Sequence, residues 1–130
     1  MDARELKGRT KRFALRAIRL VKALPRCAEA DVIGKQLLRC ACSVGANYRA
    51  ACRGRSKAEF IAKLGIVEEE ADESAFWLEL IVESGLMKPN RVKALRQEAE
   101  ELVAIICASR KSASLRRGQS KITNPKSKMR

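Results

Sequence analysis

Apolar residues recur every three or four positions in four separate segments of the chain. In the first segment, residues 10–24, they are spaced by four, three and four residues: Phe13, Ala17, Leu20 and Leu24. This spacing places side chains on one face of an α-helix. Pro25 follows directly and disfavours helical geometry in the residue before it. The pattern therefore predicts a helix over residues 10–24.

The second segment, residues 32–52, shows the same periodicity, and Asp31 is a candidate N-cap. Gly45 interrupts it and costs up to ~1 kcal/mol relative to alanine. Gly54 lies where helices often terminate. The periodic positions are Ile33, Leu37, Cys40, Val44, Asn47 and Ala51.

The third segment opens with Ser56-Lys57-Ala58-Glu59, an S-x-x-E capping box that satisfies backbone donors at a helix start. Gly85 lies at the expected C-terminal end. The periodic positions between them are Phe60, Leu64, Val67, Ala71, Ser74, Leu78 and Ile81.

The fourth segment starts near Pro89-Asn90 and fades around residues 112–114. Sustained three-four spacing and short connections predict an all-α, antiparallel up-down four-helix bundle over residues 1–113. Residues 114–130 contain six Lys and Arg, no acidic residue, Gly118 and Pro125. This composition predicts a disordered basic tail.

The amino-acid composition limits the kinds of catalytic and metal-binding site that the chain can form. Hydrophobic residues make up 46% of the 130 residues, enough for a core, and the 4% of aromatic residues favours helices over sheets. The absence of histidine excludes Ser-His-Asp triads, Cys-His pairs and histidine-ligated zinc. We therefore expect no enzymatic activity, no cofactor and no metal.

The cysteines and the apolar runs point to the cytoplasm. No uninterrupted apolar run is long enough to span a membrane, and residues 1–22 lack the apolar block of a signal peptide. Five cysteines without a framework spacing indicate free thiols in a reducing compartment. Cys40 and Cys42 form a C-x-C pair on a helix, which directs the two thiols to different faces.

Basic residues follow one side of each of the first two predicted helices. Lys and Arg number 28 against 15 Asp and Glu, a formal charge of +13, and residues 1–29 alone carry nine basic and three acidic residues. Two basic stripes on neighbouring helices predict binding of RNA or DNA through phosphates, without strong sequence preference because exposed aromatic rings are scarce. The alternative is that both stripes are ordinary solvated faces. The candidate nucleic-acid-binding residues are Arg9, Arg12, Arg16, Arg19, Lys22, Arg26, Lys35, Arg39, Arg49 and Arg53.

The third predicted helix has the opposite charge: residues 56–85 carry two basic and eight acidic residues. Its carboxylates form a solvated face, a Mg²⁺ site of a nuclease, or a surface that meets the basic helices of another subunit; we favour the first over the second. Phe76, Trp77 and Leu80 point away from the core positions, which predicts an oligomer interface. The alternative is that a wide core or the loops cover them.

Three stretches of this sequence together resemble a known family. They are residues 37–51, with Ser-Val-Gly-Ala-Asn-Tyr-Arg-Ala-Ala from Ser43; residues 55–60, Arg-Ser-Lys-Ala-Glu-Phe; and the acidic and apolar residues 68–80. From about residue 13 to 112 the chain resembles the four-helix-bundle family associated with intervening sequences of bacterial large-subunit rRNA genes. The same family includes accessory proteins of diversity-generating retroelements.

The resemblance implies an up-down bundle that assembles as a ring, a homopentamer. In the retroelement branch it also implies a basic surface that binds nucleic acid and a partner reverse transcriptase. Many members read Val-Pro-Ala-Asn-Ile-Ala-Glu-Gly where this chain has Gly45 for the proline and Ala50-Ala51 for Glu-Gly. A role of that glutamate is therefore not carried over.

Taken together, these observations predict a non-catalytic, oligomeric protein that binds RNA or DNA, as an accessory factor to a nucleic-acid enzyme in the retroelement case. The alternative is a protein-interaction scaffold whose basic and acidic faces pair between subunits.

Overall fold

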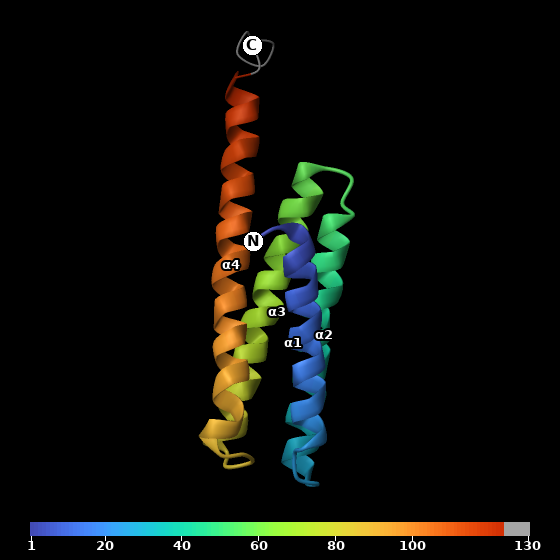
Figure 1. Ribbon diagram of the computed structural model, residues 1–130, viewed down its shortest axis with the longest axis vertical. Coiled ribbons are helices and arrows are strands. Elements are labelled where there is room, and N and C mark those ends of the chain that lie inside the picture. The colour runs from blue at the N-terminus through green and yellow to red at the C-terminus, as the bar shows by residue number, and fades with distance from the viewer. Residues whose placement is uncertain (124–130) are drawn as a thin grey trace.

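The computed structural model describes the backbone of residues 1–123 and the side chains of residues 1–118. It contains the four helices α1 (Ala3–Lys22), α2 (Ala28–Cys52), α3 (Lys57–Glu83) and α4 (Pro89–Thr123). Consecutive helices run antiparallel through short loops (Figure 1). This confirms the all-α up-down four-helix bundle. None of the helices in residues 1–123 combines the length and apolarity that a bilayer crossing needs.

α1 begins about two turns earlier than the apolar pattern predicts. The side chain of Asp2 caps it by accepting a hydrogen bond of 2.8 Å from the Glu5 backbone N–H. Leu6 and Thr10 are buried, and the Thr10 hydroxyl donates to the Leu6 carbonyl at 2.9 Å. This internal bond lets a polar residue occupy a core position. The apolar spacing therefore does not continue into the first two turns, and the pattern places the start of the helix too late.

The N-terminal caps of α2 and α3 differ. α2 starts at Ala28 after Cys27, which makes no side-chain capping bond, so the prediction of Asp31 as the N-cap is wrong. Ser56 caps α3 as predicted, because its hydroxyl accepts from the Glu59 N–H at 3.1 Å. Gly85 follows α3 with φ of 79°, a conformation that favours glycine, as its place at the helix end predicts.

α4 continues to Thr123, beyond the end that the pattern predicts around residues 112–114. In Figure 1 it extends past the ends of the other three helices. The predicted disordered tail is therefore helical over residues 114–123, where leucine, arginine and lysine are good helix formers. Residues 124–130 of the predicted tail lie outside the described residues.

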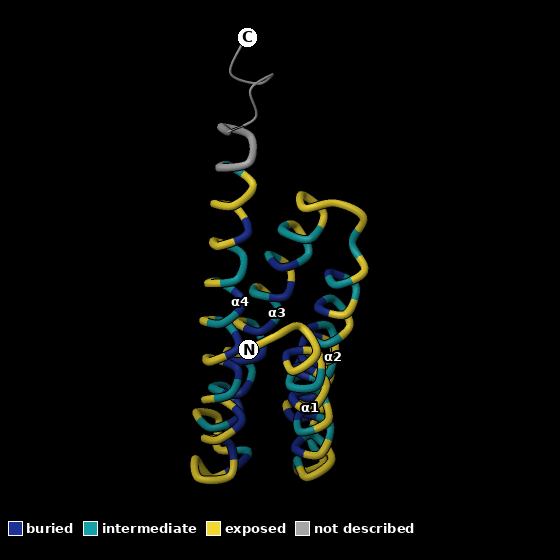
Figure 2. The backbone as a smooth tube through the Cα atoms, turned by 45° about the horizontal axis from the view of Figure 1, so that its top comes forward, coloured by how far each residue is buried: buried dark blue, intermediate teal, exposed yellow. Residues whose placement is uncertain are grey.

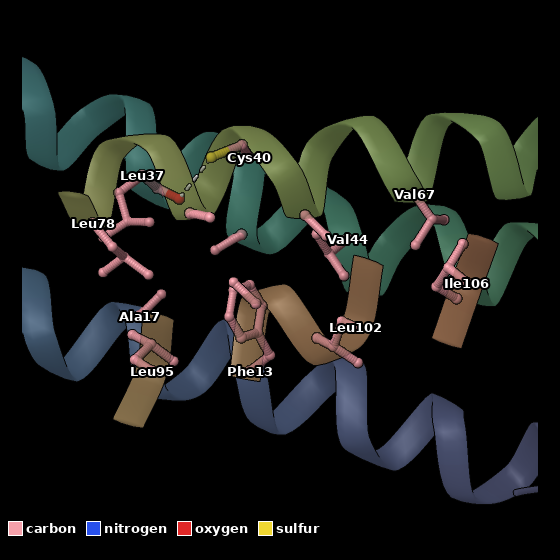
Figure 3. Close-up of a cluster of buried hydrophobic side chains, with 14 of the residues drawn as sticks. Phe13, Ala17, Leu37, Cys40, Val44, Val67, Leu78, Leu95, Leu102 and Ile106 are labelled. Atoms are coloured by element: carbon pink, nitrogen blue, oxygen red, sulfur yellow. Dashed lines mark hydrogen bonds between the residues drawn. The ribbon is translucent and has the colours of Figure 1, made fainter. Parts of the chain in front are cut away.

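All four helices contribute to one core (Figures 2 and 3). Its largest fully buried side chains include Phe13 of α1, Leu37 of α2, Leu78 of α3 and Leu102 of α4. Full burial of such a side chain is worth roughly 1.5–3 kcal/mol. α1 packs against α2 much more than against α4.

Gly45 lies where α1 and α2 approach closely. A Cβ atom there would lie 3.3 Å from the backbone oxygen of Thr10, tighter than most real contacts. The glycine that weakens the helix pattern therefore permits the close packing of the two basic helices.

The C-x-C pair splits as predicted, since Cys40 is buried and Cys42 is exposed. The Cys40 thiol donates to the Leu37 carbonyl at 3.5 Å (Figure 3), and burial raises its pKa.

Candidate nucleic-acid interface

Most of the predicted cations of α1 lie on its outer side. Arg12, Arg19 and Lys22 are exposed and Arg16 is half-buried; Arg26, in the loop after α1, is exposed too. Among residues 1–118, none of these five forms a salt bridge. Their charges therefore face solvent without a neutralising carboxylate in contact.

Arg9 is placed differently from the other predicted cations of α1. Its Nε and Nη2 atoms donate to the two carboxylate oxygens of Glu98 at 2.6 and 2.8 Å, and Nη2 also donates to Glu101 at 2.7 Å. The hydrogen bonds that Arg9 donates to Glu98 are the largest cause of its raised pKa. Arg9 thus joins α1 to α4, and we remove it from the nucleic-acid interface because two carboxylates already occupy its guanidinium.

Arg39 of α2 is likewise engaged by the acidic helix. Its guanidinium pairs with Glu70 at 3.3 Å and with Glu73, and its Nε donates to Gln36 at 3.1 Å. Part of the acidic face of α3 therefore pairs with a basic helix of the same chain, at the surface of the bundle. Arg39 is therefore already paired with carboxylates, in contrast to the unpaired cations predicted beside it; its phosphate contact stays a prediction.

A groove of about 540 Å³ lies between α1 and α2. Its cations are Lys7 and Lys11 from α1, Arg49 from α2 and Arg53 directly after the end of α2, and all four are exposed. The other residues that line it are small: Gly8, Ala14, Cys42, Gly45 and Ala46. None of the groove residues, all within the described part of the chain, is acidic or joined to a carboxylate by a salt bridge.

The predicted basic residues of α2 lie in different environments. Arg49 and Arg53 line the groove beside α1, whereas Arg39 turns toward α3. Lys35 is exposed near the start of α2 and does not line the groove. The structure therefore brings together only two of the four predicted cations of this helix.

Sequence reasoning missed Lys7 and Lys11. Lys7 precedes the predicted start of the helix at residue 10. At 100° per residue Lys11 falls at the edge of the basic half-circle and Lys7 lies between that edge and the apolar side. That edge faces α2, as the packing of Val21 against Gly34 shows. The four-residue spacing of the two lysines was a usable signal once the helix is known to start at Ala3.

The three predicted interface residues of α3 do not all point outward. Phe76 is 50% exposed, whereas Trp77 packs against the core and Leu80 is half-buried. The Trp77 indole N–H donates to Glu73 at 3.0 Å, and together with Arg39 it lowers the pKa of that carboxyl. The prediction that Trp77 lies away from the core is wrong; it is a peripheral core residue, and Phe76 carries the exposed apolar surface.

Metal-ligating groups do not gather in the described part of the chain: no three Cys, Asp or Glu side chains there lie close enough to hold an ion. The carboxylates of α3 are instead spread along the helix, with Glu68 paired to Arg110 of α4 at 3.0 Å and Glu70 and Glu73 paired to Arg39.

Comparison with known proteins agrees with this architecture. A crystal structure of a protein of unknown function from the S23 ribosomal protein family of Bacteroides thetaiotaomicron is 32% identical, with a TM-score of 0.76. The match covers 81% of this chain and 97% of that one. No curated protein matches the chain. The family of 23S rRNA-intervening sequence proteins matches residues 5–108, and the chain therefore belongs to that family.

Proposed function

We propose that this protein binds RNA, without catalysing a reaction on it, through phosphate contacts centred on the groove between α1 and α2. The observation that carries the proposal is the convergence of Lys7, Lys11, Arg49 and Arg53 on one groove without a lining carboxylate among the described residues. Four such cations from two helices repel one another, and a phosphodiester backbone is an anion that relieves this repulsion along its length.

The lining of the groove suits a backbone rather than a base sequence. Lysine acts as a point charge and arginine forms paired hydrogen bonds to phosphate oxygens, and neither contact depends on the base attached. The small residues of the floor leave room for a strand to approach the helices. The exposed cations Arg12, Arg19 and Lys22 extend the positive surface along α1.

RNA is the first candidate because the family to which the chain belongs takes its name from 23S rRNA. DNA offers the same phosphates and stays an outcome of the binding experiment. We propose no catalytic step: the chain has no histidine to act as an imidazole base on a ribose hydroxyl. Purified protein with added Mg²⁺ should therefore leave RNA intact.

We also propose that the protein is a homo-oligomer, with a pentamer as the expected size, and that half-exposed Phe76 lies in the contact between subunits. Burial of an exposed aromatic ring at every interface would stabilise a ring assembly. A reverse transcriptase or another nucleic-acid enzyme is the protein partner that the retroelement relatives suggest. The scaffold alternative loses support, because Arg39 already neutralises part of the acidic face within one chain.

The test is a titration of fluorescently labelled RNA, followed by anisotropy, with two double variants that remove the same charge. Lys11→Gln with Arg49→Gln removes two of the four positive charges in the groove. Lys57→Gln with Lys93→Gln removes two exposed lysines elsewhere. The groove variant should bind about tenfold more weakly, and the control about twofold or less. Equal losses in the two variants would show that net charge, and not the groove, determines binding.

A further inference from the structure

A second groove lies on the other side of α1, where α1 and α4 face each other. It has a volume of about 290 Å³. Three arginines line it, Arg16 and Arg19 from α1 and Arg91 from the first turn of α4. Among the residues at its floor are the apolar side chains of Leu20, Met87 and Leu95.

The packing of the helices explains why this groove exists. α1 packs against α4 much less than against α2, and the ion pairs of Arg9 join the two helices nearer the start of α1. Toward the end of α1, Leu20 and Met87 each keep 9% of their surface open. These core residues are largely buried, so the floor offers only a narrow strip of apolar surface to a ligand.

The electrostatics of this groove favour an anion. In the described part of the chain, none of the three arginines forms a salt bridge. Arg91 stands in the first turn of α4, where the helix dipole is positive, and Arg19 and Lys22 offset the negative end of α1. A ligand here meets three guanidinium groups above an apolar surface.

We propose that the α1–α4 groove holds one unpaired nucleotide of a bound RNA, and this inference rests on the proposed function. The phosphate lies at the three arginines, and the flat base lies over Leu20 and Leu95 beneath an arginine side chain. Guanidinium groups serve both purposes, since they pair with phosphate oxygens and stack on bases. Arginine takes the stacking role here because no aromatic residue lines this groove.

The size of the groove limits its occupant. At about 290 Å³ it lies at the lower end of small-ligand sites. Its volume therefore suits a single nucleotide. A continuous duplex keeps its bases stacked inside, so only a loop, a bulge or a single strand supplies an unpaired base. The protein should consequently bind single-stranded or looped RNA in preference to a duplex.

The experiment compares Arg91→Gln with Lys93→Gln, an equal loss of charge on the same helix at a residue outside this groove. Each variant is titrated with a single-stranded RNA of about 12 nucleotides, its perfect duplex, and an abasic strand of equal phosphate content. Arg91→Gln should weaken single-strand binding about tenfold and duplex binding about twofold or less. The abasic strand should bind the wild type more weakly than the intact strand. Its loss of affinity with Arg91→Gln should be smaller than that of the intact strand, because only the phosphate contact is then removed.

A 2-aminopurine in the single strand gives an independent signal, because its fluorescence changes when the base leaves its neighbours. That change should occur with the wild type and with Lys93→Gln, and should be lost with Arg91→Gln. Equal losses on single strand and duplex would overturn the nucleotide site while leaving RNA binding intact. Failure of the wild type to bind any of the three ligands would overturn the proposed function and this inference together.

Discussion

Replacing Arg9 with glutamine should destabilise the bundle while leaving RNA binding nearly unchanged. The variant removes the bidentate contact with Glu98 and the further bond to Glu101, which together link α1 to α4. It also leaves the Glu98 carboxylate without its cation at a site where its side chain is only 15% exposed. Because α1 and α4 touch little elsewhere, few other contacts compensate.

The magnitude follows from the exposure of the partners. The Arg9 side chain is 20% exposed and Glu98 is 15% exposed, so their charge-assisted contact is partly shielded from water. Such hydrogen bonds contribute about 1.5–3 kcal/mol when buried, and solvent screening reduces this to about 1–2 kcal/mol here. Glu101 is 49% exposed and adds little. The loss corresponds to a decrease of roughly 5 °C in Tm for a domain of this size.

The assay is thermal unfolding followed by circular dichroism, together with the RNA titration, on Arg9→Gln and on Arg12→Gln. Arg12 is exposed on the same helix and forms no ion pair within residues 1–118, so its variant should keep the wild-type Tm and lose RNA affinity. An unchanged Tm in Arg9→Gln, or an affinity loss as large as that of Arg12→Gln, would refute the assignment of Arg9 to the link between helices.

Three further features can be tested: the accessibility of the two thiols, the charge of Glu73 and the exposed ring of Phe76. The exposed Cys42 thiol should react with a maleimide and be protected by bound RNA, whereas buried Cys40 should stay unmodified in the folded protein; peptide mapping distinguishes them. Because the pKa of Glu73 is lowered, its contribution to stability should be present above the ordinary glutamate value and be lost as the pH falls through the lowered folded value. The Tm difference between wild type and Glu73→Gln, measured against pH, checks this, and a difference that persists at strongly acidic pH would contradict it. Phe76→Ser should reduce the mass seen by light scattering without reducing helicity, and an unchanged mass would exclude this surface as the subunit interface.

The helices were predictable because the spacing of apolar residues records which face each helix buries. Phe13, Leu37 and Leu78 all belong to the predicted faces and are all fully buried. Helix ends were less predictable, since they depend on individual hydrogen bonds. The Ser56 cap has a recognisable sequence signature, whereas α2 starts after Cys27 without a side-chain bond.

The candidate site was predictable only in part, because it depends on how neighbouring helices are rotated. The pattern of α1 identifies its outward side but not the residues that the next helix presents to it. Sequence alone does not distinguish Arg9 from a free cation, because Glu98 comes beside it only in the fold. Lys11 likewise reaches a groove only because α2 lies close to α1 at Gly45.

The salt dependence of RNA binding shows whether the groove between α1 and α2 holds phosphates. Each phosphate contact to a single strand contributes about −0.7 to the slope of log K against log[salt]. If the four cations of the α1–α2 groove bind phosphates, the wild type should show a slope of about −3 or steeper. Lys11→Gln with Arg49→Gln should reduce that slope by about 1.4, while Lys57→Gln with Lys93→Gln leaves it unchanged. A slope near zero in the wild type, or the same slope in both double variants, would contradict phosphate binding at this groove.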